Sequence, residues 1–271
     1  MARTAAYLKS FFDRVEDNLT AYGLFAIAVL WMVAGHFSEN LTESLWLRVT
    51  DRILLPVFLI PIGYNAGRRV DWKLAGGAVL VSSLRWFMFH RWLPALSMGY
   101  VTILVTIVIT RLVLEPLMEF ALKSRARFWG ASLALAGLAP FTHSHVCEYG
   151  TLGILMAMAG WLSRNRGQEP KPPVEPSEFF LLVYFYYIAF NQSLYEFSAP
   201  QLAVTAAGTA VVFRLLWDFR RLLLNSLRSK PADIVARVAR FTGGNSLEIY
   251  TLHMIAYYGI YYYALGVAAG P

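Results

Sequence analysis

Runs of mostly apolar residues recur along the whole chain, and short polar connections separate them. A helix needs about 20 such residues to cross the hydrocarbon core of a bilayer. We expect spanning helices at about 21–37, 53–66, 74–93, 96–117, 128–140, 149–162, 179–194, 202–219 and 246–267. The second, fifth and sixth runs are short, so polar residues or neighbouring helices must cap their ends. The pattern predicts an all-α, polytopic membrane bundle of about nine transmembrane helices.

The composition is typical of an integral membrane protein. Of its 271 residues, 57% are hydrophobic and only 15% are charged, whereas a soluble domain carries about 25% charged residues. Eighteen Phe, fifteen Tyr and eight Trp supply side chains that fill membrane interiors and interfacial belts. The length suits a single membrane domain, 1–271.

Lys and Arg gather in alternate connections, which sets the expected orientation. Basic connections precede the first run and follow the second, fourth, sixth and eighth. The connections around 38–43, 142–148 and 197–201 contain neither Lys nor Arg. The positive-inside rule therefore places the N-terminus in the cytoplasm and, after an odd number of spans, the C-terminus outside. Because the net charge of +7 is dispersed over short loops, it predicts topology, and we expect no nucleic-acid partner.

Three segments are expected to lie outside the spans. Residues 1–20 mix charged and apolar residues at helical spacing, which predicts an interfacial amphipathic helix. Residues 164–178 include the Pro-rich stretch GQEPKPPVEP and predict an extended inner linker. Residues 220–244 alternate basic and apolar side chains, which predicts a basic amphipathic segment on the inner leaflet.

Ionisable side chains at membrane depth are costly, so each calls for a cavity, a partner or a function. His36 ends the first run, Asp51 and Arg52 open the second, and Arg85 lies in the middle of the third. His253 lies about two turns inside the last run. The other histidines gather toward the outer face with His36: His90, His143 and His145. Purely structural roles are the alternative: an Asp51–Arg52 ion pair, and a hydrogen bond from His253 across helices.

A metal site at the outer connection is a second interpretation that the residues allow. In an extended segment His143 and His145 would share one side, and Cys147 or Glu148 would complete a tetrahedral shell. The rest of the chain lacks ligands at the spacing of a known zinc motif, so we expect no metal. It also lacks a phosphate-binding loop, a Rossmann fingerprint and a Gly-x-Ser-x-Gly elbow.

Four segments, spread over most of the chain, resemble the TraX-like family of membrane proteins that acetylate conjugative pilin. They are LWMVAGHF with His36, DRILLPVFLIPIGYNAGRR with Arg52, EYGTLGILM with Glu148, and SLEIYTLHM with Tyr250 and His253. The last segment is also similar, more weakly, to acyltransferase-3 and heparan N-acetyltransferase relatives. The family usually carries Asp before the first histidine, where this chain has Gly35. Asp51 on the next helix is a substitute source of that carboxylate.

The resemblance implies a bacterial inner-membrane enzyme that moves acetyl from cytoplasmic acetyl-CoA to the N-terminal amine of a processed pilin subunit. The expected partners are thus a pilin or another membrane-associated acceptor and the lipid bilayer. Guanidinium groups suit the phosphates of CoA. The expected donor-binding residues are Arg68, Arg69, Arg85, Arg125, Arg127, Arg220 and Arg221.

The expected chemistry needs a base that removes a proton from an amine whose pKa is about 8. We expect His36 to be this base, oriented by Asp51, with His253 the second choice or the agent of another step. Arg52 or Arg85 would stabilise the developing oxyanion. The alternatives are a proton-coupled transporter or flippase, and a pilus-assembly membrane factor without catalysis. Against a transporter stands the absence of an internal repeat in the sequence.

Overall fold

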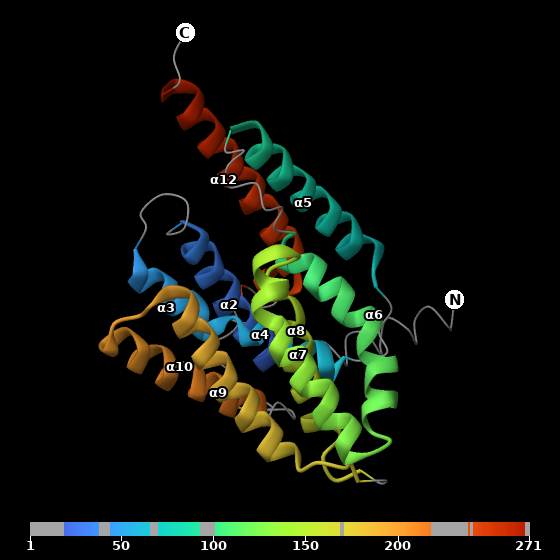
Figure 1. Ribbon diagram of the computed structural model, residues 1–271. Coiled ribbons are helices and arrows are strands. Elements are labelled where there is room, and N and C mark those ends of the chain that lie inside the picture. Colours follow the sequence, from blue (N-terminus) through green and yellow to red (C-terminus); the bar gives the residue numbers. More distant parts are fainter. Residues whose placement is uncertain are drawn as a thin grey trace.

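The computed structural model describes residues 19–37, 44–65, 70–92, 101–168, 171–217, 238 and 241–268 (Figure 1). In these ranges the chain is helical apart from its connections and one isolated bridge between Val101 and Cys147, so the all-α prediction is confirmed. The helices are α2 (Leu19–Phe37), α3 (Leu45–Leu54), α4 (Pro56–Tyr64), α5 (Trp72–Trp92), α6 (Ile103–Ala121), α7 (Arg125–His145), α8 (Gly150–Asn165), α9 (Pro176–Tyr195), α10 (Ala199–Trp217) and α12 (Ser246–Ala268).

Each predicted apolar run coincides with one helix or one broken helix. The second run corresponds to α3 and α4 together, which begin eight residues before the predicted start at 53. Pro56 cannot donate a backbone hydrogen bond and divides the two helices. Leu55 between them keeps helical angles, φ −52° and ψ −40°, so the chain continues as one interrupted rod. The sequence did not reveal the early start of α3, because α3 carries polar residues that face a cavity.

Helix α8 lies at the centre of the bundle (Figure 1), and nearly all of its residues are buried. Its closest neighbour is α4, and two glycines set the distance between them. A Cβ on Gly63 would collide with the backbone carbonyl of Ala157, and one on Gly160 with the carbonyl of Ile60. The two backbones are therefore in direct contact, as in helix pairs joined through small residues.

Helix α10 buries polar side chains together with apolar ones and exposes apolar side chains. Its buried face carries Gln201, Thr205 and Thr209, while Val204 and Val211 are 45% and 61% exposed. By length and composition, one helix in the described ranges, α10, qualifies as a membrane span, and 23–37 is a shorter apolar stretch. A single helix of this kind also occurs in soluble proteins.

The segments predicted to lie outside the spans are described only in part. Residues 1–18 and 218–237 lie outside the described ranges, and with them most of both predicted amphipathic segments. The predicted inner linker is shorter than expected, because α8 continues to Asn165 and α9 begins at Pro176. Pro176 occupies the first turn of α9, where a missing N–H costs nothing.

Candidate functional site

A cavity of about 610 Å³ lies among the helices that carry the predicted catalytic residues. Its wall is built by α2, α3, α4, α5, α6 and α12, with the turn between α7 and α8. His36, Asp51 and Arg52 line it directly. His253 joins them through a contact with His36. The four residues predicted to be catalytic thus belong to one region of the bundle.

His36 and His253 form a hydrogen-bonded pair, although 217 residues separate them in the sequence. The Nδ1 atom of His36 lies 2.8 Å from Nε2 of His253. The ring centroids are 5.1 Å apart with an interplanar angle of 19°, and the edge of Tyr250 contacts both rings. Both imidazoles are half-buried, so the pair is held in place yet remains at the cavity.

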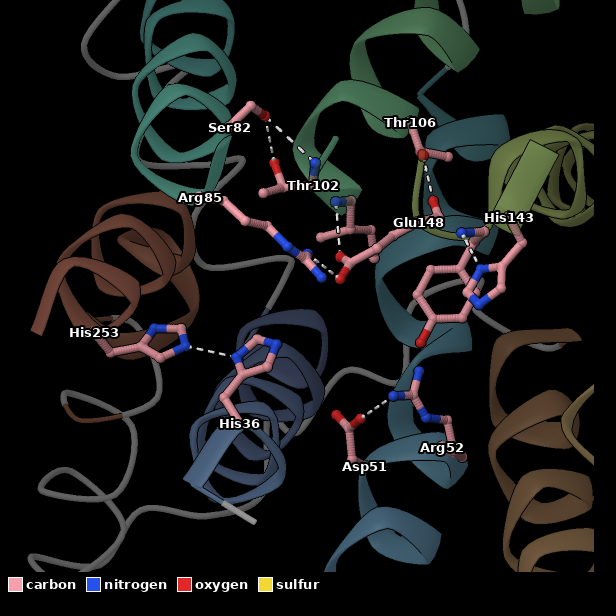
Figure 2. Close-up of polar contacts among 12 residues, drawn as sticks. His36, Asp51, Arg52, Ser82, Arg85, Thr102, Thr106, His143, Glu148 and His253 are labelled. Atoms are coloured by element: carbon pink, nitrogen blue, oxygen red, sulfur yellow. Dashed lines mark hydrogen bonds and ion pairs between the residues drawn. The ribbon is translucent and has the colours of Figure 1, made fainter. Parts of the chain in front are cut away.

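The hydrogen bonds of the pair determine which ring nitrogen carries each proton. His253 Nδ1 lies 2.7 Å from the carbonyl oxygen of Ile249, and a carbonyl only accepts, so this Nδ1 is the protonated atom. In the neutral ring Nε2 of His253 is then an acceptor, and His36 Nδ1 must donate to it. The lone pair of His36 is therefore on Nε2. In Figure 2 this second nitrogen of His36 faces the space between Arg85, Glu148 and Asp51.

Asp51 and Arg52 form an ion pair on the opposite side of that space (Figure 2). Arg52 Nη2 lies 3.2 Å from Asp51 Oδ2. The buried Arg52 guanidinium also stands over the rings of Tyr149 and Tyr195, 5.4 and 4.9 Å from their centroids. Cation–π contacts of this kind fix the position of a guanidinium. Asp51 is thus a partner of Arg52, and the hydrogen bond with His253 orients the His36 ring. That Asp51 also orients His36 stays a prediction.

Gly35 allows Asp51 to approach α2. A Cβ atom at Gly35 would lie 2.6 Å from both Cβ and Cγ of Asp51. The Asp51 side chain therefore occupies the space that a side chain at position 35 would need. A carboxylate reaches the residue before His36 from the neighbouring helix, which is the source that the sequence suggested.

Arg85 and Glu148 form a second buried ion pair across the cavity wall (Figure 2). Arg85 Nη1 lies 2.6 Å from Glu148 Oε1, and Oε2 accepts the backbone N–H of Ile103 at 3.0 Å. Burial of the Glu148 carboxyl acts to raise its pKa, but the charge and hydrogen bond of Arg85, with smaller help from His36 and Ile103, hold that pKa at about 2. Glu148 also sits at the N-terminus of α6, where a negative charge is stabilised. The pair thus fixes α5, α6 and the α7–α8 turn to one another.

The turn between α7 and α8 places two more side chains at the cavity. Tyr149 has left-handed backbone angles, with φ +63°, and its N–H donates to His143 Nδ1 at 2.9 Å. A backbone N–H only donates, so this Nδ1 carries no proton. The turn is further fixed by Thr106, whose hydroxyl donates to the carbonyl of Glu148.

His143 and His145 do not lie on an extended segment, because α7 continues through both of them. The His145 ring stacks on Phe141 at 4.7 Å and is exposed, while His143 lines the cavity. Helical geometry separates the two side chains by about 200°, so the shared face required by the metal interpretation is absent. No cluster of three or more metal-ligating side chains occurs in the described part of the chain.

The arginines predicted to hold the donor's phosphates are in different situations. Arg85 lines the cavity and pairs with Glu148. Arg125 and Arg127 begin α7, are exposed and are not among the residues of the cavity wall. The remaining four lie outside the described residues: Arg68, Arg69, Arg220 and Arg221. The side chain of His90 also lies outside them.

Three residues of the cavity wall were missed in the sequence: Arg48, Arg111 and Tyr195. Arg48 lies one turn before Arg52 and stands over the ring of Tyr195, 5.5 Å from its centroid. Arg111 interrupts the apolar run ILVTIVITRLVLEPL in the middle of α6. A charge within such a run is a detectable signal for a cavity-facing residue. Tyr195 carries no comparable signal, because aromatic residues are common throughout the chain.

No protein-family model, curated protein or solved structure matches this chain in the three comparisons.

Proposed function

We propose that this chain is a membrane-embedded acetyltransferase with about nine spans. The observation that carries the enzymatic part is the hydrogen-bonded His36–His253 pair, in which the second ring nitrogen of His36 faces a polar cavity. The resemblance to the TraX-like family supplies the donor and acceptor: acetyl-CoA from the cytoplasm and the N-terminal amine of a processed pilin in the bacterial inner membrane.

The membrane part of the proposal is supported by the apolar residues on the outside of the bundle. Large hydrophobic side chains are exposed on α9 and α12 as well as α10, including Leu181, Phe185 and Leu252 at 57–65%. A soluble monomer rarely exposes contiguous apolar surface on this scale. In a bilayer such faces contact lipid, and small hydroxyl side chains bind across helices, as Ser82 and Thr102 do at 3.2 Å.

The expected orientation, with the N-terminus inside and the C-terminus outside, has a direct test. A periplasmic reporter fused after Pro271 should be active, and a cytoplasmic reporter at the same site should be inactive. The opposite result would mean that the number of spans is even.

The proposed reaction uses His36 as a general base. The acceptor nitrogen attacks the thioester carbonyl carbon, a C–N bond forms, and the C–S bond breaks to release the thiolate. Nε2 of His36 takes the proton that the amine loses and returns it to the departing thiolate, so that His36 ends the cycle neutral. Arg52 and Arg85 lie on the same cavity and would stabilise the negative charge that develops on the carbonyl oxygen.

His253 has a supporting role in this reaction. When His36 accepts a proton on Nε2, its ring becomes positive, and the hydrogen bond from Nδ1 to His253 becomes charge-assisted. His253 thereby replaces the carboxylate that holds the histidine in a serine-protease triad. It acts through His36 and is a positioning residue.

The same hydrogen bonds favour an enzyme over a proton-coupled carrier. A carrier must pass a proton from one side of the membrane to the other. On the His253 side, the hydrogen bonds that begin at His36 Nδ1 end at the carbonyl of Ile249, which cannot accept and release a proton at neutral pH. A base that returns its proton to the substrate needs no further relay.

The reaction is tested in proteoliposomes that contain the purified protein, labelled acetyl-CoA and a processed pilin subunit. Label should move to the pilin N-terminus with wild-type protein. Folded wild-type protein that transfers no label to any amine acceptor would contradict the proposal. Sequence-tagged acceptors with a blocked N-terminus provide the matched negative control.

A further inference from the structure

The break between α3 and α4 removes the helical donor of one backbone carbonyl, that of Arg52. In a continuous helix the carbonyl oxygen of residue 52 accepts the N–H of residue 56. Residue 56 is proline and has no N–H. The carbonyl one position earlier keeps its helical bond, since Asp51 accepts the N–H of Leu55 at 3.1 Å. The break therefore affects the backbone at the arginine that lines the cavity.

Tyr187 supplies the missing donor from another helix. Its hydroxyl donates to the carbonyl oxygen of Arg52, although 135 residues separate the two in the sequence. Tyr187 is fully buried in α9, and Arg52 is only 6% exposed. A buried carbonyl without a hydrogen bond is costly, so the hydroxyl of Tyr187 replaces the N–H that Pro56 lacks.

The same helix also contacts the other end of Arg52. Tyr195 follows Tyr187 by eight residues, about 12 Å along α9. The Arg52 guanidinium lies over its ring, 4.9 Å from the centroid. Helix α9 thus holds Arg52 at its backbone and at its charged group. Arg85, the second arginine of the proposed reaction, lies inside the unbroken helix α5, which supplies its own backbone donors.

We propose that Tyr187 is a positioning residue for Arg52. Its hydrogen bond fixes the backbone at the α3–α4 break and thereby holds the guanidinium where the oxyanion of the proposed reaction develops. This role rests on the proposed function and assigns it a residue outside the cavity wall, because Tyr187 is not among the lining side chains. Tyr187 acts through Arg52 and makes no contact with substrate.

Removal of the hydroxyl and restoration of the backbone donor test this role together. Tyr187→Phe should lower kcat for acetyl transfer roughly 10- to 100-fold and leave KM within about twofold, because a displaced catalytic group costs rate more than binding. Pro56→Ala restores an N–H at residue 56, so the double variant should regain most of the lost kcat. Rates are measured in proteoliposomes per quantity of folded protein, which a merely structural role would leave unchanged.

Tyr184→Phe is the matched control, since it removes the same atom from the same helix. The Tyr184 hydroxyl donates to the carbonyl oxygen of Ala206 at 3.0 Å. That carbonyl lies within α10, where Ala210 offers it a helical N–H. Its kcat should equal that of wild type. Equal losses of kcat in Tyr184→Phe and Tyr187→Phe, or additive effects of Tyr187→Phe and Pro56→Ala, would overturn the inference.

Chemical modification of arginine separates failure of this inference from failure of the proposed reaction. If wild-type protein transfers no acetyl group, modification of Arg52 by phenylglyoxal is followed by peptide mass spectrometry on the full chain. Tyr187→Phe should raise its rate roughly tenfold, the effect of about one lost hydrogen bond, and Pro56→Ala should reverse the rise. The exposed Arg125 serves as the internal standard. This result would retain the positioning contact while rejecting the transferase, whereas equal rates at Arg52 in wild type and Tyr187→Phe would overturn the contact's role.

Discussion

Two polar pairs lie on the same cavity and are built in different ways. His36–His253 joins α2 to α12 through one hydrogen bond between half-buried rings. Arg85–Glu148 joins α5 to the α7–α8 turn through an ion pair whose side chains are 14% and 18% exposed, and the N-terminus of α6 binds the same carboxylate. The first pair is joined by one hydrogen bond between its rings, whereas in the second both carboxylate oxygens accept from donors.

The first pair is therefore suited to catalysis, and the second pair to holding the helices together. A base must exchange a proton with substrate, so it needs an accessible lone pair and a modest hold on its position. A buried ion pair that loses one member leaves an uncompensated charge, so its members are fixed. We therefore expect changes in the first pair to alter turnover with little effect on folding, and changes in the second to alter folding first.

The largest expected effect is on turnover, at His36. His36→Gln should lower acetyl transfer about 10²–10⁴-fold, because general-base catalysis is lost while the hydrogen bond to His253 can be kept. His36→Gln combined with His253→Gln should be little slower than His36→Gln alone, since the two residues act as a unit. Transfer rates in proteoliposomes, with protein quantity checked by size-exclusion chromatography, give the comparison. Near-normal turnover in His36→Gln would make His36 a structural residue.

Breaking the ion pair should give the largest effect on stability. Arg85→Gln is expected to lower the free energy of unfolding by about 3–5 kcal/mol, because Glu148 would remain buried and charged. The exposed pair Lys73–Glu248, at 3.5 Å, is the matched control, and Lys73→Gln should cost less than about 1 kcal/mol. Thermal unfolding in detergent measures both. Equal effects in the two variants would remove the distinction between the pairs.

Acid titrates the same ion pair in wild-type protein. The Glu148 pKa falls from 4.5 to about 2 on folding, so its ionised form stabilises the fold above pH 4.5. That contribution, about 3 kcal/mol at roughly 1.4 kcal/mol per unit of pKa, is lost as the pH falls from 4.5 to about 2. Glu148→Gln should lack this component of the acid transition. Parallel unfolding curves for wild type and Glu148→Gln across that range would contradict it.

The smallest expected effect concerns the approach of Asp51 to α2. Gly35→Ala should destabilise the protein by about 1–3 kcal/mol, since its Cβ would overlap Asp51. Adding Asp51→Gly, which removes both overlapping atoms, should remove most of the cost of that overlap, which a double-mutant cycle detects. Gly76 in α5 has open space around it, so Gly76→Ala should be neutral or stabilising. A cycle with no coupling between Gly35 and Asp51 would show that the contact is relaxed in solution.

The sequence predicted the helices well, because apolar run length is a local property. It failed where the structure of a segment depends on contacts with residues far away in the sequence. The charged residues Arg48 and Asp51 face the cavity, so α3, the first part of the broken helix, is not an apolar run in the sequence. His143 and His145 were expected in a loop, but α7 absorbs them into its last turn.

The sequence predicted which residues belong to the candidate site, but not which of them are hydrogen-bonded to each other. His36 and Asp51 were singled out because they are ionisable at membrane depth. That His253 is a hydrogen-bonded partner of His36 depends on how α2 and α12 pack. No periodicity within either helix specifies a contact between residues so far apart in the sequence, so this pairing required the three-dimensional structure.

The glycine contacts between α4 and α8 make the α4 side of the cavity wall rigid and leave the rest of the wall able to move. Backbones that touch at Gly63 and Gly160 cannot slide or come closer without atomic overlap, so α4 moves only with the centre of the bundle. A change in cavity width would then come from other helices of the wall, such as α2 and α12, which bear the two histidines. Substrate entry through such a change would move the base relative to α4.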